Sequence, residues 1–219
     1  MDLNFMGVLQ ELPFILGGLT TTLILVLSSI LIGTIFGTLL SLMKLGKSKI
    51  LSGIATVYIS VFRGTPLILQ LAFIYFALPI AFGIDLGSYG SAILGMGLNS
   101  SAYIAEIIRS GIGSVDKGQT EASLALGIPY SKMMRSIILP QALKNILPAL
   151  INEFSVLIKE SAIVNVVALS DLMRRAMLIG SRNFLHFETL IVVGVIYYLL
   201  VMALATLGKI VERRLAVSD

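Results

Sequence analysis

Long uninterrupted apolar runs restrict the fold of this 219-residue chain more than any other feature. Residues 14–43 contain no charged side chain, and residues 189–208 contain none either. About 20 apolar residues in a helix are enough to cross the hydrocarbon core of a bilayer. Charged residues make up 13% of the chain, about half of what a soluble domain carries. The runs do not alternate in the way that barrel strands do. The sequence therefore predicts an all-α integral membrane protein.

Five membrane-spanning helices are predicted within one domain that covers residues 1–219. The second is interrupted by the sequence Arg63-Gly64-Thr65-Pro66, because proline cannot continue a helix. The segment 114–144 is too polar to span, and we expect a loop there with a helical hairpin near 128–144. The spans cover about residues 14–43, 54–82, 88–112, 145–168 and 187–210.

The distribution of basic residues predicts the orientation, because loops on the cytoplasmic side carry an excess of Lys and Arg. Residues 1–13 carry none. The loop after the first span, the loop after the third and the C-terminus carry Lys44, Lys47, Lys49, Lys117, Lys132, Arg135, Lys144, Lys209, Arg213 and Arg214. The N-terminus is therefore predicted outside and the C-terminus inside. Arginines in the outer connection 169–186 depart from this rule, and we expect an amphipathic helix there at the outer interface.

Several classes of function lack the residues that they need. There is no cysteine, and His186 is the single histidine, so no catalytic residue and no metal site is predicted. Gly46-Lys47-Ser48 resembles the end of a nucleotide-binding loop, but Ser41 stands where that pattern requires glycine. A stripe of basic residues for nucleic acid is also missing.

One charged stretch, Glu121–Pro140, stands between the apolar runs. It opens with good helix formers, followed by Gly127 as a C-terminal cap and by Pro129, which prevents continuation. A short exposed helix of this kind suits insertion into a groove on a partner protein, or it is an ordinary interfacial helix. The candidate coupling residues are Glu121, Ala122, Leu124, Leu126 and Gly127.

The same stretch resembles the signature loop of the membrane subunits of ABC importers. The matching positions are Glu121-Ala122, Gly127, Ile137 and Leu139-Pro140, with Ser123 in place of a second alanine. The segments Tyr58–Leu67, which contains Phe-Arg-Gly-Thr-Pro-Leu, and Asn99–Arg109 resemble the branch of these permeases that transports polar amino acids. The resemblance covers nearly the whole chain.

The resemblance implies a permease subunit in the bacterial cytoplasmic (inner) membrane that is not itself an enzyme. The implied partners are an ATPase subunit that binds ATP and Mg, an extracellular or periplasmic substrate-binding protein, and a second permease subunit, with a homodimer expected. No cofactor is expected in this subunit, and no nucleic acid partner. The implied mechanism is alternating access, driven through the Glu121–Gly127 loop. The alternatives are a heterodimer, an ATP-independent secondary transporter or channel, and a membrane-embedded enzyme.

Charged and polar residues inside the spans supply the candidate cargo site, since each is costly in a bilayer unless it is paired or faces a cavity. An amino acid needs groups of both signs, although a structural ion-pair network explains the same residues. Glu106 and Arg109, three apart, are expected to pair structurally. Acidic residues outnumber lysine in the fourth span, which favours polar or cationic cargo without identifying it. The candidates are Glu153, Lys159, Glu160, Arg63, Asn99 and Tyr103.

Overall fold

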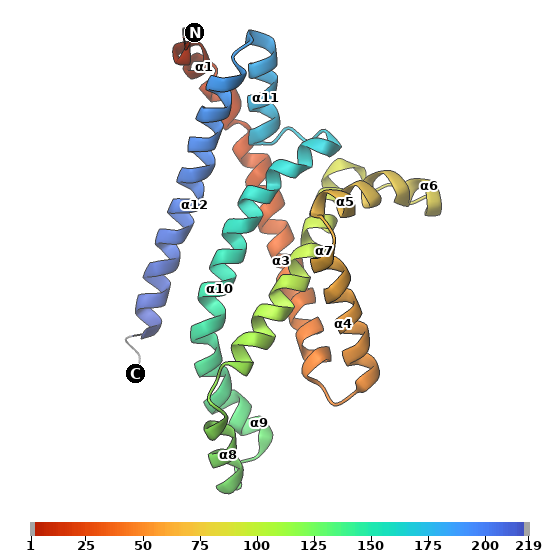
Figure 1. Ribbon diagram of the computed structural model, residues 1–219, viewed down its shortest axis with the longest axis vertical. Helices are drawn as coiled ribbons and strands as arrows, with labels where there is room; N and C mark the ends of the chain where they lie inside the picture. The colour runs from red at the N-terminus through yellow and green to blue at the C-terminus, as the bar shows by residue number, and fades with distance from the viewer. Residues whose placement is uncertain (1–2, 217–219) are drawn as a thin grey trace.

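The computed structural model describes residues 3–216, with side chains to residue 210, and every regular element in that part of the chain is helical. The body is built from α3 (Gly18–Leu45), α7 (Gly87–Gly113) and α10 (Leu139–Glu160), while α12 (His186–Ala216) packs along one side of α10 (Figure 1). Buried Leu, Ile, Met and Val side chains from α3, α5, α7 and α10 form the main core. The predicted all-α fold class is confirmed.

Close packing of α3 against α7 depends on two glycines of α3. A Cβ on Gly33 would lie 3.1 Å from Ser100, and a Cβ on Gly37 would lie 2.8 Å from the Ser101 carbonyl oxygen. Two helices can approach this closely only where small residues line the contact. The Gly33-xxx-Gly37 pair therefore packs within the chain.

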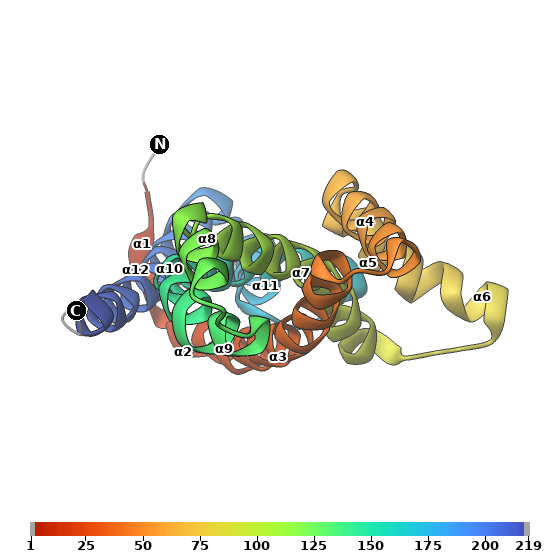
Figure 2. The ribbon, with the colours of Figure 1, turned by 90° about the horizontal axis from the view of Figure 1, so that it is seen from below.

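The expected second span is bent by 104°. The chain forms α4 (Lys49–Gly64), stops at Thr65 and Pro66, and resumes in a different direction as an arm of three short helical pieces. Figure 2 shows this arm projecting away from the helices of the body. The predicted interruption is present, but α4 and the arm do not make one straight helix. The arm consists of α5 (Leu67–Ala72), the π-helix Phe73–Ala77 and α6 (Leu78–Phe82).

The predicted cytoplasmic hairpin differs in one detail from the observed one. Helical structure continues from α9 (Tyr130–Met133) through a π-helix at Met134–Ile138 into α10, so 128–144 is not itself a hairpin. The hairpin is instead made by this continuous helix and by α8 (Lys117–Ala125), which packs against its start. Pro140 lies inside this continuous helix, directly after the π-helix, and supplies no N–H to its backbone hydrogen bonds.

Two helices in the described residues are long and apolar enough to cross a membrane, Leu12–Leu45 and His186–Ile210, and the bent pair is a third if counted as one span. α7 and α10 fall short on composition because they carry polar residues such as Asn99, Ser100 and Glu153, all of which are buried inside the protein. Their polarity faces other helices of the chain. The count of five spans therefore stays a prediction.

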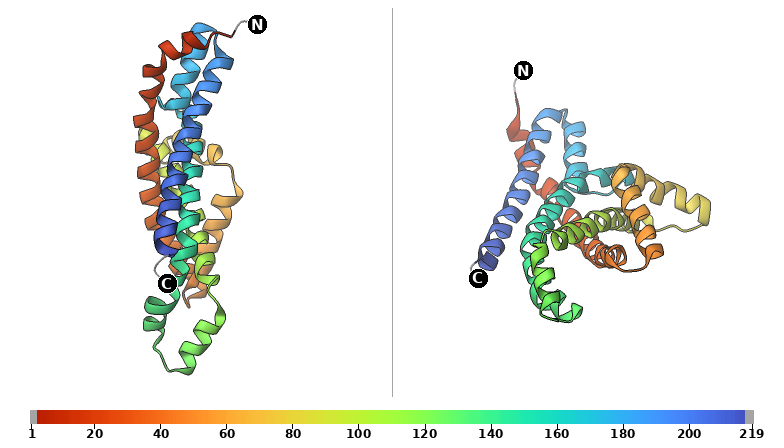
Figure 3. Two further views of the ribbon diagram at one scale, coloured as in Figure 1. Left: turned by 90° about the vertical axis from the view of Figure 1, so that its left-hand side faces the viewer. Right: turned by 60° about the horizontal axis from the view of Figure 1, so that its bottom comes forward.

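Residues 169–186 contain the expected amphipathic helix, α11 (Leu172–Asn183), whose apolar face is buried at Leu172, Ala176 and Ile179. It runs alongside the first turns of α12 instead of lying across them (Figures 1 and 3). Arg175 donates to the Phe14 carbonyl oxygen at 3.0 Å and stacks over the Phe14 ring. This arginine thus ties α11 to α2 (Leu12–Leu16), which gives it a structural role that a charge count does not foresee.

Candidate functional site

The charged loop lies at one end of the molecule, at the bottom of Figure 1, where α8 and α9 form the tip of the hairpin. Gly127 ends α8 with a left-handed φ of +69°. Its N–H donates to the Leu124 carbonyl oxygen at 3.0 Å, and the Ile128 N–H donates to the Ser123 carbonyl oxygen at 2.9 Å. These two bonds define a Schellman motif, which satisfies carbonyl groups that the end of the helix leaves open. The predicted cap is therefore present, built entirely from neighbouring residues.

The start of α8 lies earlier than its sequence indicated. Asp116 caps the helix by accepting the Gly118 N–H at 2.7 Å, so Glu121 lies in the middle of α8 and not at its beginning. Aspartate is among the strongest N-cap residues because its carboxylate replaces a missing backbone acceptor. The cap had a recognisable signal, since Gln119 stands three residues after Asp116, as in a capping box.

The tip exposes apolar side chains that the described part of the chain leaves uncovered. Leu124 is 60% exposed and Leu126 is 78% exposed, and Glu121 and Ala122 are exposed beside them. Ser123 is 3% exposed and faces the other way, and its hydroxyl donates to the Gln119 carbonyl oxygen at 2.6 Å. The small residue at this position thus lets α8 pack against the helix that begins with α9, while its neighbours form a surface that suits a partner.

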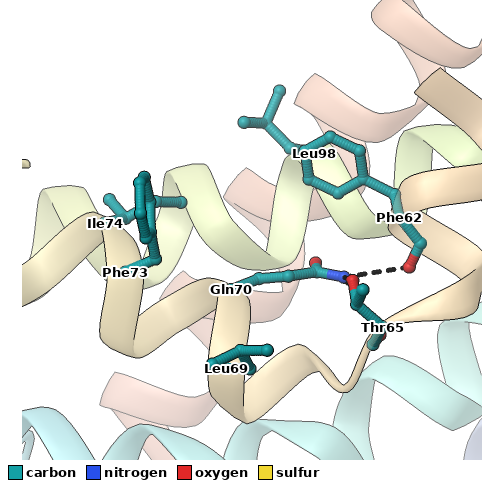
Figure 4. A pocket seen from close by; sticks show the side chains of 7 residues that line it. All are labelled: Phe62, Thr65, Leu69, Gln70, Phe73, Ile74 and Leu98. Carbon is teal, nitrogen blue, oxygen red and sulfur yellow. Dashed lines mark hydrogen bonds between the residues drawn. The ribbon is translucent and has the colours of Figure 1, made fainter. Parts of the chain in front are cut away.

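A second feature is the elbow between α4 and α5, where Pro66 removes a helical N–H donor (Figure 4). The Gln70 amide nitrogen donates to the Phe62 carbonyl oxygen at 2.9 Å, to the Thr65 carbonyl oxygen at 3.1 Å and to the Thr65 hydroxyl at 2.9 Å. The Asn99 amide nitrogen donates to the Phe62 carbonyl oxygen at 3.2 Å and to the Gln70 amide oxygen at 3.0 Å. Carbonyl groups at the break are thus occupied by two amides.

Arg63 and Tyr103 meet at the same elbow. The Arg63 guanidinium lies over the Tyr103 ring, 5.3 Å from its centroid, and the arginine remains exposed. No ion pair to Arg63 is found in the described part of the chain. Three predicted site residues, Arg63, Asn99 and Tyr103, are therefore brought together here.

A pocket of about 320 Å³ lies beside the elbow, between the end of α4, the arm and α7, and its seven lining residues are labelled in Figure 4. Its lining is apolar apart from Thr65 and Gln70, whose polar groups are already bonded to each other. A pocket of this composition does not suit an ammonium or a carboxylate, because neither would recover the hydrogen bonds lost with water.

The acidic candidates lie on α10. Glu153 is buried, and its carboxylate accepts a hydrogen bond from the Ser100 hydroxyl at 2.9 Å. Asn99 and Ser100 are neighbours on α7, yet one bonds to the elbow and the other to α10. Lys159 is exposed and Glu160 is half-buried at the last turn of α10. The six candidates thus fall into an elbow group, Arg63, Asn99 and Tyr103, and an α10 group, Glu153, Lys159 and Glu160.

Glu106 joins two cations, as part of the structural network that the sequence indicated. Its carboxylate pairs with Arg109 on the next turn of α7 and with Lys44 of α3 at 3.1 Å. The expected Glu106–Arg109 pair is confirmed, and Lys44 is an addition. Such a pair holds the last turn of α3 against α7.

Sequence reasoning missed Gln70 and Ser100. Gln70 had a usable signal, since it lies four residues after Pro66 and can reach back to the carbonyls that a proline break exposes. Ser100 had none, because its partner Glu153 is 53 residues away and only the packing of α7 on α10 joins them.

Outside the long helices, Asp171 is a fully buried carboxylate that caps α11. It accepts N–H groups from Met173 at 3.3 Å and Arg174 at 2.9 Å, and the hydroxyl of Tyr197 at 3.2 Å. Burial raises the pKa of the Asp171 carboxyl, and these hydrogen bonds oppose the rise only in part.

Comparisons with known proteins agree with this arrangement. Residues 29–217 match the family model described as the inner membrane component of binding-protein-dependent transport systems. The chain is 50% identical to the arginine transport system permease protein ArtQ of Bacillus subtilis over 219 residues, which is all of both chains. It is 32% identical to the glutamate/aspartate import permease protein GltK of Escherichia coli, over 98% of this chain and 99% of that one.

Solved structures give the same result. An amino acid ABC transporter crystallised with histidines superposes with a TM-score of 0.92 at 42% identity, covering 98% of this chain and 100% of the other. The MetNI methionine ABC transporter, at 22% identity and a TM-score of 0.71, shares the fold. By its sequence over 189 residues and by its fold, this chain belongs to the family of inner membrane components of binding-protein-dependent transport systems.

Proposed function

We propose that this chain is the permease subunit of an ATP-driven amino acid importer and that α8 transmits the motion of an ATPase to the spans. The observation that carries this is the tip of the hairpin. It combines a capped short helix with Leu124 and Leu126, which are exposed at a polar end of the molecule. Exposed apolar side chains on a rigid helix suit a groove on another protein.

The partners follow from the family. A separate ATPase would bind ATP and Mg and hydrolyse the nucleotide, and a binding protein would deliver the cargo outside. A second copy of this chain would complete the path, since symmetric pairs are the commonest oligomers. Closure of the two ATPases would draw the two hairpins together and open the path outward, a two-state change biased by ATP.

Five spans with the N-terminus outside are proposed for the chain in the bilayer. Basic residues at the end of α3 and at the hairpin support this orientation. Because the natural sequence has no cysteine, single cysteines at Ser48, Lys117 and Ser181 can report the exposed side directly. An impermeant thiol reagent added outside whole cells should label Ser181→Cys alone. Labelling of Lys117→Cys from outside would overturn the orientation.

Amino acid cargo is supported by the relatives, whose names specify arginine, glutamine and glutamate/aspartate transport. The proposed cargo site is built from the two groups described above. In α10 Glu153 and Glu160 would meet an ammonium or a cationic side chain, and Lys159 a carboxylate. In the elbow Arg63 would meet a carboxylate, with Asn99 and Tyr103 beside it.

Reconstitution tests the function as a whole. The permease, the ATPase and the binding protein are placed in vesicles, and uptake of a panel of radiolabelled amino acids is measured with ATP, without ATP and with each component omitted. We expect uptake only when all components and ATP are present. Uptake that persists without the ATPase would show an ATP-independent transporter.

A further inference from the structure

We propose that Gln70 and Asn99 are positioning residues that hold Arg63 in place as the anchor for the carboxylate of the transported amino acid. The proposal rests on the function proposed above and assigns separate tasks within the elbow. Arg63 touches the cargo, while the two amides fix the backbone from which Arg63 projects.

The first step is the geometry of the two amides. The Gln70 amide nitrogen reaches across the break to the carbonyl groups of Phe62 and Thr65, on both sides of Arg63 in the chain. The Asn99 amide nitrogen bonds the Phe62 carbonyl oxygen and the Gln70 amide oxygen. Each side-chain N–H therefore has an acceptor, and a fully bonded, partly buried network of this kind favours a single conformation.

One face of α7 holds the end of α4. Asn99 and Tyr103 are four residues apart and so lie one above the other on α7. The first bonds the backbone at Phe62, and the second receives the Arg63 guanidinium on its ring. A third fastening point is Tyr58, whose hydroxyl donates to the Leu98 carbonyl oxygen at 3.0 Å. Backbone and side chain of the last turn of α4 are thus both held by α7.

The next step is the charge of Arg63. The other arginine between residues 50 and 115 is Arg109, which is neutralised by Glu106. Arg63 is exposed, makes a contact with an aromatic ring, and has no ion pair in the part of the chain that the structure describes. A cation at membrane depth that is held in place but not neutralised is available to an anion, and arginine matches the two oxygens of a carboxylate.

The amides themselves are poor candidates for direct contact with cargo. Both N–H groups of Asn99 are used within the protein, and its exposed fraction is 4%. The apolar pocket beside them offers no counter-charge. Their effect on cargo would therefore pass through the position of Arg63.

The experiment measures binding to the purified permease–ATPase complex in nanodiscs, without the binding protein. The probes are L-arginine with L-argininamide and L-glutamine with its C-terminal amide, because each amide lacks only the carboxylate charge. The quantity of interest is the ratio of the two dissociation constants within a pair. We expect the complex to prefer the carboxylate form by roughly tenfold or more, the size expected for a charged hydrogen bond.

Arg63→Gln should bring this ratio close to one. Gln70→Leu and Asn99→Leu should each lower it, and the double variant should lower it no further than the stronger single one, because the two amides act as a unit. Asn165→Leu is the matched control, since that amide also joins two segments through Arg174 but lies outside the elbow. It should leave the ratio unchanged.

A ratio that survives Arg63→Gln would overturn the assignment of Arg63. If Gln70→Leu weakens binding of acid and amide equally, the amides serve stability alone and the positioning role is wrong. Vesicle uptake with the binding protein, measured in parallel, separates a failure of the importer function from a failure of the elbow proposal. Absent uptake refutes the importer, whereas normal uptake with no preference for the carboxylate refutes only the elbow proposal.

Discussion

The hairpin tip and the elbow both end a helix abruptly, but they do so by different means. Gly127 ends α8 through hydrogen bonds among residues at most five apart in sequence, and the left-handed φ is its only special requirement. The elbow is held by Asn99 from another helix, 37 residues from the carbonyl that it bonds. A locally built stop is suited to a rigid part that is pushed by a partner. A stop held by a second helix can respond to movement of that helix.

The largest effect is expected from the exposed face of the hairpin, and it tests whether a locally built tip is the coupling surface. Leu124→Asp combined with Leu126→Asp should abolish ATP-dependent uptake, because two buried charges would oppose docking in an apolar groove. Membrane insertion, followed by the yield of purified protein, should be unchanged. Ile50→Asp is the control, since Ile50 is 77% exposed in the first turn of α4. Wild-type uptake by the double variant would remove α8 from the interface.

A smaller effect is expected at Gly127, where a side chain would strain the backbone conformation without meeting a neighbouring atom. A Cβ there would meet nothing within 4 Å, so only the φ of +69° penalises a side chain. Gly127→Val should reduce uptake about tenfold, since the left-handed region costs an L-residue about 1–2 kcal/mol. Gly127→Asn should lose much less, because asparagine tolerates this conformation. Equal rates for the two variants would show that the cap does not shape the tip.

Asp171 combines the two kinds of support that distinguish the hairpin tip from the elbow. It caps α11 locally, and it accepts a hydrogen bond from the distant Tyr197. The raised pKa means that native protein keeps a proton that the unfolded chain has released, so stability falls as pH rises through the native pKa. Asp171→Asn keeps the cap but cannot ionise. The difference in melting temperature, variant minus wild type, should therefore increase by a few degrees when the pH is raised from about 4 to about 8.

A constant difference between the two melting temperatures across that range would show that the pKa of the Asp171 carboxyl is not raised in the folded protein. Asp171→Ala provides the comparison for the cap itself. It should lower the melting temperature at both pH values, because it removes the acceptor for the Arg174 N–H.

The smallest effect is expected at Pro66. If the elbow is held by Gln70 and Asn99, restoring one backbone N–H by Pro66→Ala should leave uptake within about twofold of wild type, since the amides keep their acceptors. Uptake by the purified system is the measurement. A large loss would show that proline itself sets the bend, which would make the elbow a local device like the hairpin cap.

The hairpin was largely predictable and the elbow was not, for the same physical reason. Gly127, Pro129 and the exposed leucines act on their immediate neighbours, so the sequence alone indicates the helix end and the short exposed helix. Only the position of the elbow was visible, in Pro66. Its direction and its lock depend on α7, as does the bond between Ser100 and Glu153. The helices α7 and α10 were recognised from the sequence, but their polar side chains have separate partners. Asn99 bonds at the elbow, Glu106 pairs with Lys44 of α3, and only Ser100 bonds Glu153.

The elbow also constrains how the protein is made. Asn99 leaves the ribosome 29 residues after Gln70, so α4 and α5 are synthesised with the Gln70 bonds in reach but before the bonds from Asn99 can form. Neither α4 nor the arm that follows it is long enough alone to cross a bilayer, although together they are. The apolar stretch 54–82 would then enter the membrane as one segment that already breaks at Pro66, and α7 would fix the direction of the break when it arrives. Assembly of the elbow would then be a late step in biogenesis, set by the arrival of one asparagine.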